Sequence, residues 1–145
     1  LRARQDNSWI GELRDERLQR CTQWVLAVEA DGEQQQVANE VPELAKIAER
    51  HPSVGDVRGL GVFWAIELVK DRATREPLVP FNATGPAAAP MGAVVAACKE
   101  RGVWPFVHFN RLQLAPPLIT SDDDLRLGLD AIDAALDVAD SYVGS

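Results

Sequence analysis

The chain has few of the residues that most often reveal a chemical function from sequence alone. Of its 145 residues only two are cysteines, Cys21 and Cys98, and two are histidines, His51 and His108. Two cysteines this far apart form neither a disulfide framework nor a metal motif, so we expect a reducing compartment and a core position for Cys98. No Ser-His-Asp set, phosphate-binding P-loop or pair of metal ligands at helical spacing is present. We therefore predict no metal site and no catalytic residue in this chain.

Excess positive charge and long apolar runs are also missing. The formal net charge of −7 argues against nucleic acid, whose binders need clustered Lys and Arg. No segment approaches the roughly 20 apolar residues of a membrane span. The charged first twenty residues do not resemble a signal peptide. We expect no nucleic-acid partner, no membrane partner and a cytoplasmic location.

What the chain does have is enough apolar sequence for one domain, with 46% hydrophobic residues. The apolar spacing from residue 36 onward predicts a helix, a long strand, a loop, a helix, a short strand, a further strand and a final helix. The bounds we expect are 36–50 for the first helix, 57–69 for the long strand, a helix after Pro90 ending near Arg101, and 122–142 for the last helix. This order predicts an α+β two-layer sandwich, with helices on one face of a small, mainly antiparallel sheet.

Three local patterns in these elements have structural explanations. Gly59 and Gly61 lie two apart in the long strand, which suggests a bulge or the close approach of another backbone or ligand. His51 precedes Pro52 at a helix end, where we expect only a favourable interaction with the negative end of the helix. The triplet at 122–124 is acidic and could bind a metal. Its place just after Ser121 instead favours capping of the last helix.

The stretch from Val103 to Thr120 is the most site-like part of the chain. Arg111 and Gln113 alternate with leucines, so the period of a strand places both polar side chains on one face. An arginine and an amide beside His108 and Phe109 could bind a small carboxylate ligand. The alternatives are an amphipathic strand whose arginine faces water and a histidine that serves only the turn.

Three motifs carry a resemblance to a known family. They are HPSVGDVRGLG at 51–61, AIELV at 65–69 and LAPPLI at 114–119. In this order they resemble the C-terminal small domain of class III (omega-amino acid) aminotransferases, a domain of the fold type I pyridoxal-phosphate enzymes. The resemblance implies two parts, a divergent helical lead-in over 1–40 and the small domain over 41–145. A start at Leu1 rather than Met also suggests a fragment.

The resemblance implies a cofactor, pyridoxal 5'-phosphate, and a homodimer of the full-length enzyme. In such enzymes the cofactor bonds to a lysine of the large domain, which also holds the phosphate and the pyridine nitrogen. None of those motifs occurs here, and Lys46, Lys70 and Lys99 are better explained as surface charges. We therefore expect no cofactor-binding residue in this chain, and no activity without the large domain.

The resemblance also implies a substrate class. The family often has an arginine for the substrate α-carboxylate three residues before the first proline of the Pro-Pro-Leu motif, and Gln113 occupies that position here. This departure favours an amine or ω-amino acid as amino donor and a keto acid as acceptor. We expect Arg111, Gln113, Phe109 and His108 to contact substrate, and Trp104 and Phe106 to complete the pocket wall.

Two other functions fit the same fold. The chain could be a non-catalytic interaction or dimerisation module that remains after loss of the large domain. It could also belong to a pyridoxal-phosphate aminomutase or decarboxylase, because this fold hosts those reactions as well.

Overall fold

The computed structural model describes residues 42–144 except residue 118, so the predicted lead-in over 1–40 and Cys21 lie outside the described residues. A helix spans residues 42–50. The other elements are β1 (Val54–Leu60), β2 (Phe63–Asp71), β3 (Glu76–Pro77), the short 3-10 helix η2 (Gly85–Ala88), α3 (Ala89–Glu100), β4 (Phe106–His108), β5 (Arg111–Leu114) and α4 (Asp122–Asp140). None of the described helices is both long and apolar enough to cross a membrane.

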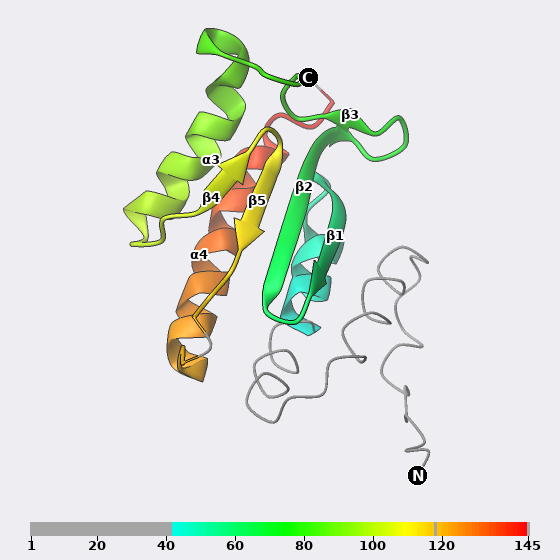
Figure 1. Ribbon diagram of the computed structural model, residues 1–145. Helices are drawn as coiled ribbons and strands as arrows, with labels where there is room; N and C mark the ends of the chain where they lie inside the picture. Colours follow the sequence, from blue (N-terminus) through cyan, green and yellow to red (C-terminus); the bar gives the residue numbers. More distant parts are fainter. Residues whose placement is uncertain (1–41, 118, 145) are drawn as a thin grey trace, which may run out of the picture.

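The strands form one antiparallel sheet with the order β1-β2-β5-β4, and β3 pairs with the far end of β2. The 42–50 helix and α4 lie behind this sheet, and α3 packs alongside α4 near β4 (Figure 1). Apolar residues of all three helices join Trp64, Ile66, Leu68 and Leu112 in one core. The α+β prediction, with helices on one face of an antiparallel sheet, is therefore confirmed.

The single long strand predicted over 57–69 is wrong, because the chain folds there into the β1–β2 hairpin. Leu60 pairs with Phe63, which leaves Gly61 and Val62 as a two-residue turn. Gly61 has a φ of +58°, a value that glycine adopts without steric cost. Gly59 lies opposite Trp64, where a Cβ would collide with the Phe63 carbonyl oxygen and the indole ring. The close approach expected at the glycines is therefore to the chain's own hairpin, not to a ligand.

The last helix, α4, is capped and buried as its sequence predicts, although it ends at Asp140 rather than Tyr142. The Ser121 hydroxyl accepts a hydrogen bond from the Asp124 N–H at 3.2 Å. The acidic residues 122–124 lie in the first turn, where the helix dipole favours negative charge. The buried stripe includes Leu125, Leu129, Ile132, Leu136 and Ala139. In α3, Cys98 is buried as expected, and burial raises the pKa of its thiol.

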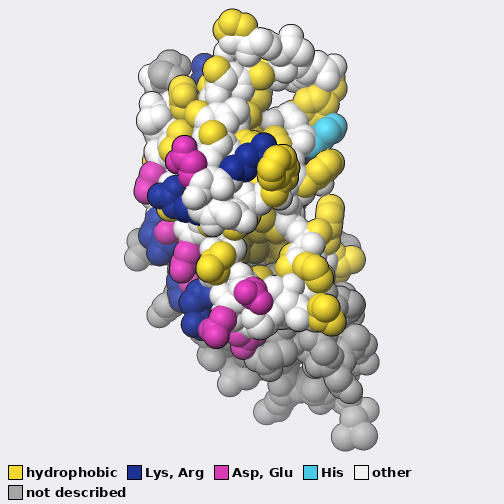
Figure 2. All heavy atoms as spheres, turned by 90° about the vertical axis from the view of Figure 1, so that its left-hand side faces the viewer, with side chains coloured by type: hydrophobic (Ala, Val, Ile, Leu, Met, Phe, Trp, Pro, Cys, Tyr) yellow, Lys and Arg dark blue, Asp and Glu magenta, His cyan; other side chains and the backbone are white. Residues whose placement is uncertain are grey.

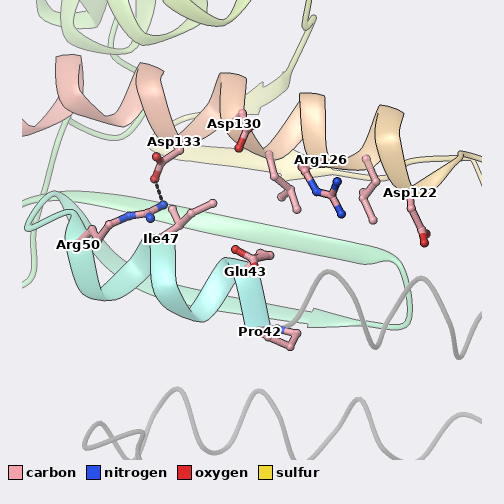
Figure 3. A pocket seen from close by; sticks show the side chains of 10 residues that line it. Pro42, Glu43, Ile47, Arg50, Asp122, Arg126, Asp130 and Asp133 are labelled. Carbon is pink, nitrogen blue, oxygen red and sulfur yellow. Dashed lines mark hydrogen bonds and ion pairs between the residues drawn. The ribbon is translucent and has the colours of Figure 1, made fainter.

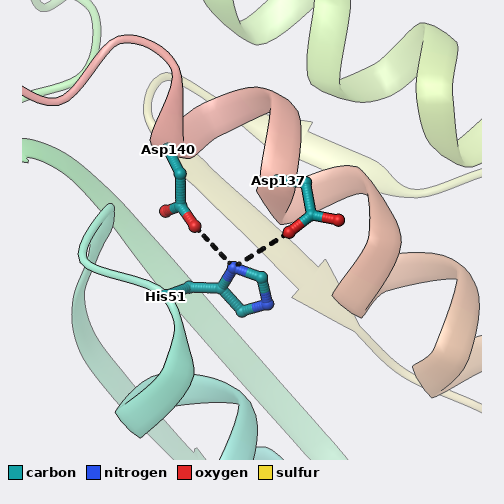
Figure 4. Close-up of side chains that lie close together, drawn as sticks. All are labelled: His51, Asp137 and Asp140. Atoms are coloured by element: carbon teal, nitrogen blue, oxygen red, sulfur yellow. Dashed lines mark hydrogen bonds and ion pairs between the residues drawn. The ribbon is translucent and has the colours of Figure 1, made fainter.

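His51 has a larger structural role than its sequence position suggests. It is 5% exposed and lies between the end of the 42–50 helix and α4 (Figure 4). Its Nδ1 lies 2.7 Å from Asp140 Oδ2, and its Nε2 lies 3.0 Å from Asp133 Oδ1. The prediction that it interacts only with its own helix end is therefore wrong. Arg72 instead covers that end, donating to the carbonyls of Ala48 and His51.

Truncation of the α4 stripe should destabilise the domain. Leu136 is fully buried, so Leu136→Ala should lower the free energy of unfolding by about 3–4 kcal/mol through lost transfer energy and the cavity left behind. Leu127 on the same helix is 60% exposed, and Leu127→Ala should change the free energy of unfolding by less than about 0.5 kcal/mol. Urea denaturation of both variants checks this. Equal effects would show that the buried face of α4 is misassigned.

The carboxylates that hold His51 should make stability depend on pH. Burial alone would raise the pKa of Asp133, but hydrogen bonds from His51 and Arg50 outweigh it and lower that pKa. The stabilisation is therefore present above the unfolded-state pKa, about 4, and is lost as the pH falls through the folded-state value. Asp133→Asn should cost about 1 kcal/mol at neutral pH.

The measurement is the unfolding free energy of the wild type and of Asp133→Asn between about pH 7 and about pH 3. Near pH 3 the carboxylate of an unfolded chain is mostly protonated. The difference between them should shrink toward the acid end. Asp130→Asn, which changes an exposed carboxylate of the same helix, serves as the control. A difference that stays constant with pH would contradict the linkage.

Candidate active-site surface

The sheet has a second face, opposite the helices, and this face carries the polar residues expected to form the site. Leu112 of β5 is fully buried, whereas its neighbours Arg111 and Gln113 are half-buried and share the open face. The shared face predicted from the alternation is therefore present. In Figure 2 the flank on the sheet side carries apolar side chains and a histidine, whereas the helical flank alternates acidic and basic groups.

The structure brings three of the predicted residues into direct contact. The Arg111 guanidinium lies 3.0 Å from Nδ1 of His108, its partner across the β4–β5 pair. Since a guanidinium only donates, this ring nitrogen accepts. The rings of His108 and Phe109 are 3.9 Å apart between centroids. Phe109 has a φ of 56°, a rare conformation for a bulky residue.

Sequence reasoning missed Phe81, an exposed residue of the loop between β3 and η2. Its ring lies 4.2 Å from that of Phe109 and extends the row of contacts that runs through His108 to Arg111. The only signal in the sequence was its place in a long, proline-rich loop, and such loops often carry function. Phe109 also lines a mostly apolar hollow of about 520 Å³, together with Val79, Met91 and Val107.

Gln113 has a different neighbourhood on the same face. It pairs with Ala65 of β2 on one side and with Phe106 of β4 on the other. Phe106 is 65% exposed, so an exposed aromatic ring lies at the position paired with Gln113. Trp104, which precedes β4, is 81% exposed and lies under the ammonium group of Lys99, 3.7 Å from the ring centroid.

Within residues 42–144, the charge of Arg111 has no acidic partner. Across β2 and β5 its partner is Glu67, yet within the described range no carboxylate lies within ion-pair distance of Arg111. Glu67 is instead bound by Arg58, with Nη2 and Oε2 2.7 Å apart. An arginine without an acidic partner is suited to bind an incoming carboxylate through two parallel hydrogen bonds.

Two other polar clusters are explained by the fold. His51, Asp137 and Asp140 offer ligand atoms within 4.8 Å of one another. However, Asp140 also accepts from the Ser53 N–H, and both ring nitrogens of His51 already contact carboxylates. A hollow of about 370 Å³ between the 42–50 helix and α4 is lined by charged residues and by four apolar ones, Pro42, Ile47, Leu125 and Leu129. Arg50 is paired to Asp133 across it (Figure 3). Both clusters join the 42–50 helix to α4.

The lysines show whether this chain could hold a carbonyl cofactor by itself. Lys46 pairs with Glu43 at 2.7 Å, Lys70 lies 3.9 Å from Glu76, and Lys99 covers Trp104. The sequence contains no other lysine. A lysine that attacks a carbonyl needs a site that lowers its pKa, commonly a desolvated one. None of these three is buried, so the residues present do not fit a covalently bound aldehyde cofactor.

Comparison with known proteins identifies the setting of this surface. The family model for aminotransferase class-III matches residues 21–136. The chain belongs to the class III aminotransferases. Family members are pyridoxal-phosphate enzymes, and the sheet with its helices is the α+β small domain seen in solved relatives.

Curated relatives of the aminotransferase domain show which enzymes it is similar to. It is 44% identical over 101 residues to the taurine–pyruvate aminotransferase of Rhodobacter capsulatus, an alignment that covers 64% of this chain and 20% of that protein. It is 36% identical over 97 residues to the 4-aminobutyrate aminotransferase GabT of Escherichia coli, covering 66% and 21%. The chain thus spans about a fifth of the length of the curated relatives it matches.

A solved structure shows the same fold. The taurine:2-oxoglutarate aminotransferase of Bifidobacterium kashiwanohense, in complex with PLP and glutamate, superposes with a TM-score of 0.67 at 27% identity. The match covers 76% of this chain and 24% of that one. The boundary at residue 40 and the substrate contacts stay predictions.

The lysine environments predict how this aminotransferase chain behaves with the cofactor. Mixed with pyridoxal 5'-phosphate, the chain should give only a weak, non-specific absorbance, because no lysine lies in a desolvated site. Spectrophotometric titration of the chain and of its Lys46→Arg, Lys70→Arg and Lys99→Arg variants checks this, and all four should behave alike. A stoichiometric adduct abolished by one of these substitutions would refute it.

Proposed function

We propose that this chain is the small domain of a pyridoxal-phosphate transaminase that moves an amino group from an amine or ω-amino acid to a keto acid. The proposal is supported by its membership of the class III aminotransferases and by its span of about a fifth of its relatives. The observation that carries it further is the open sheet face, where the Arg111 guanidinium contacts His108 and has no acidic partner among the described residues. On this proposal the chain is inactive alone, because the lysine that bonds to the cofactor comes from the large domain.

The nature of the amino donor is argued from Gln113. An amide at this position cannot match the bidentate, charge-assisted contact that an arginine makes with an α-carboxylate. A donor without an α-carboxylate does not need that contact. Two relatives, a taurine–pyruvate aminotransferase and a 4-aminobutyrate aminotransferase, have names that agree with such donors.

The acceptor is a keto acid, whose carboxylate needs a positive partner. Arg111 supplies one on the same strand face, two residues before Gln113. His108 holds the guanidinium through its Nδ1, and Phe109 and Phe81 form a wall beside it. These residues bind and orient the acceptor, while the bond-making chemistry belongs to the part of the enzyme that holds the cofactor.

The exposed apolar residues of the open face suit a domain contact. Leu60, Phe63 and Phe106 are each more than half exposed, at 54%, 53% and 65%. A group of this kind on one face marks an interaction surface. We propose that the large domain of the same enzyme covers it, and that the full-length enzyme is a cytoplasmic homodimer.

The competing interaction-module function and the aminomutase or decarboxylase functions are separated by two measurements. The reading frame upstream of Leu1 either encodes a large domain with the cofactor lysine or does not. Product analysis of the protein encoded by the whole gene then distinguishes a transferred amino group from an isomer or from released carbon dioxide. Transfer to a keto acid is the outcome we expect.

Substitution of Arg111 tests the proposed acceptor site in the full-length enzyme. Arg111→Ala should weaken kcat/KM for the keto acid by about 2–3 kcal/mol, because a charge-assisted pair is lost. Steady-state kinetics with varied acceptor measure this. Arg126→Ala, which removes an exposed arginine of α4 paired with Asp123, is the matched control and should leave kcat/KM unchanged. Identical kinetics for the two variants would remove Arg111 from the site.

A further inference from the structure

One row of side chains crosses β1, β2, β5 and β4 on the open face. Asp56 of β1 pairs with Glu67 of β2, Glu67 pairs with Arg111 of β5, and Arg111 pairs with His108 of β4. Side chains directly opposite each other on one face of an antiparallel pair have Cβ atoms close enough to interact, and opposite charges there usually attract. The default partner of Arg111 is therefore Glu67.

That default pair does not form, because Glu67 is held from the other side. Its Oε2 accepts from Arg58 at 2.7 Å, and its Oε1 lies 3.9 Å from an Nη atom of Arg75. Arg58 also donates to Asp56 at 2.6 Å, so it neutralises two carboxylates that would otherwise repel each other. Arg111 turns instead to the uncharged acceptor of His108.

We propose that Arg58 is a positioning residue for acceptor recognition, because by holding Glu67 it keeps the Arg111 guanidinium available for the carboxylate of the keto acid. The inference rests on the proposed role of Arg111 in binding that acceptor. It adds a residue of β1, one strand beyond the contacts with Arg111, to the determinants of specificity.

The charges of the row support this arrangement. Asp56 and Glu67 are balanced by Arg58 and Arg75, which leaves the positive charge of Arg111 as the excess on this part of the face. Glu67 is 24% exposed and Arg58 43% exposed, so the pair lies partly out of water. Burial alone would lower the pKa of Arg58, but Glu67 and Asp56 outweigh it and raise that pKa, consistent with a tightly held guanidinium.

Removal of Arg58 should therefore give Glu67 a new partner. The carboxylate loses its short hydrogen bond and keeps only the longer contact to Arg75. Arg111 is then the nearest cation directly across the β2–β5 pair. A glutamate bound there competes with the incoming keto acid, whereas an amine donor without a carboxylate is not affected.

The test uses the full-length enzyme and its steady-state kinetics. Arg58→Ala should raise KM for the keto acid about fivefold with little change in kcat, the competition expected from one partly exposed ion pair. KM for a carboxylate-free amine donor should stay the same. Arg58→Ala combined with Glu67→Gln should restore the KM for the keto acid, because a neutral amide does not compete. Arg58→Lys should retain much of the wild-type value, and Arg126→Ala is the control.

Each result decides the matter. A rise in KM for both substrates, or a failure of Glu67→Gln to restore it, would show that Arg58 acts only through the fold and would overturn the inference. If Arg111→Ala raises KM for the keto acid and Arg58→Ala does not, Arg58 has no positioning role while the proposed function stands. If neither substitution changes KM for the keto acid, Arg111 does not bind the acceptor, and both the proposed acceptor site and this inference are wrong.

Discussion

The pairing of β2 with strands on both sides is the constraint on which the rest of the domain depends. Its period of two places Trp64, Ile66 and Leu68 in the core, so Ala65 and Glu67 must face the other way. A shift of one residue in either pairing would exchange these two sets. The same register sets Arg111 and Gln113 beside β2 on the open face. The same strand register therefore determines both the packing of the core and the positions of the candidate site residues.

The helical layer is held in place by charge as well as by apolar contact. His51 at the end of the 42–50 helix lies between two carboxylates of α4, and Arg72 from the end of β2 donates to the carbonyls of the same helix end. Such contacts connect segments that are far apart in the chain, so they select one arrangement of helices over the sheet.

Electrostatics on the open face follow from competition among a few groups. Glu67 contacts Arg58 of β1 and Arg75 of the turn between β2 and β3, and it lies opposite Arg111 of β5. Arg111 is consequently left with a neutral partner and an available positive charge. If Arg111 binds the acceptor as proposed, its availability depends on residues that do not touch the substrate. The proposed specificity then rests on the network of Arg58, Glu67 and Arg111.

Much of this protein was determined by the sequence alone. The alternation at 111–114, the capped amphipathic helix after Ser121 and the motif order from 51 to 119 predicted the fold class and the family, because each depends on local periodicity or local chemistry. Only the tertiary structure decided the rest. The turn at Gly61 splits one apparent strand into two, and this alone brings Arg58 to Glu67. His51 contacts Asp140 of α4, and Phe81 contacts Phe109, although the partners are far apart in the sequence. Spacing along the chain cannot encode such contacts, because they depend on how separate elements pack.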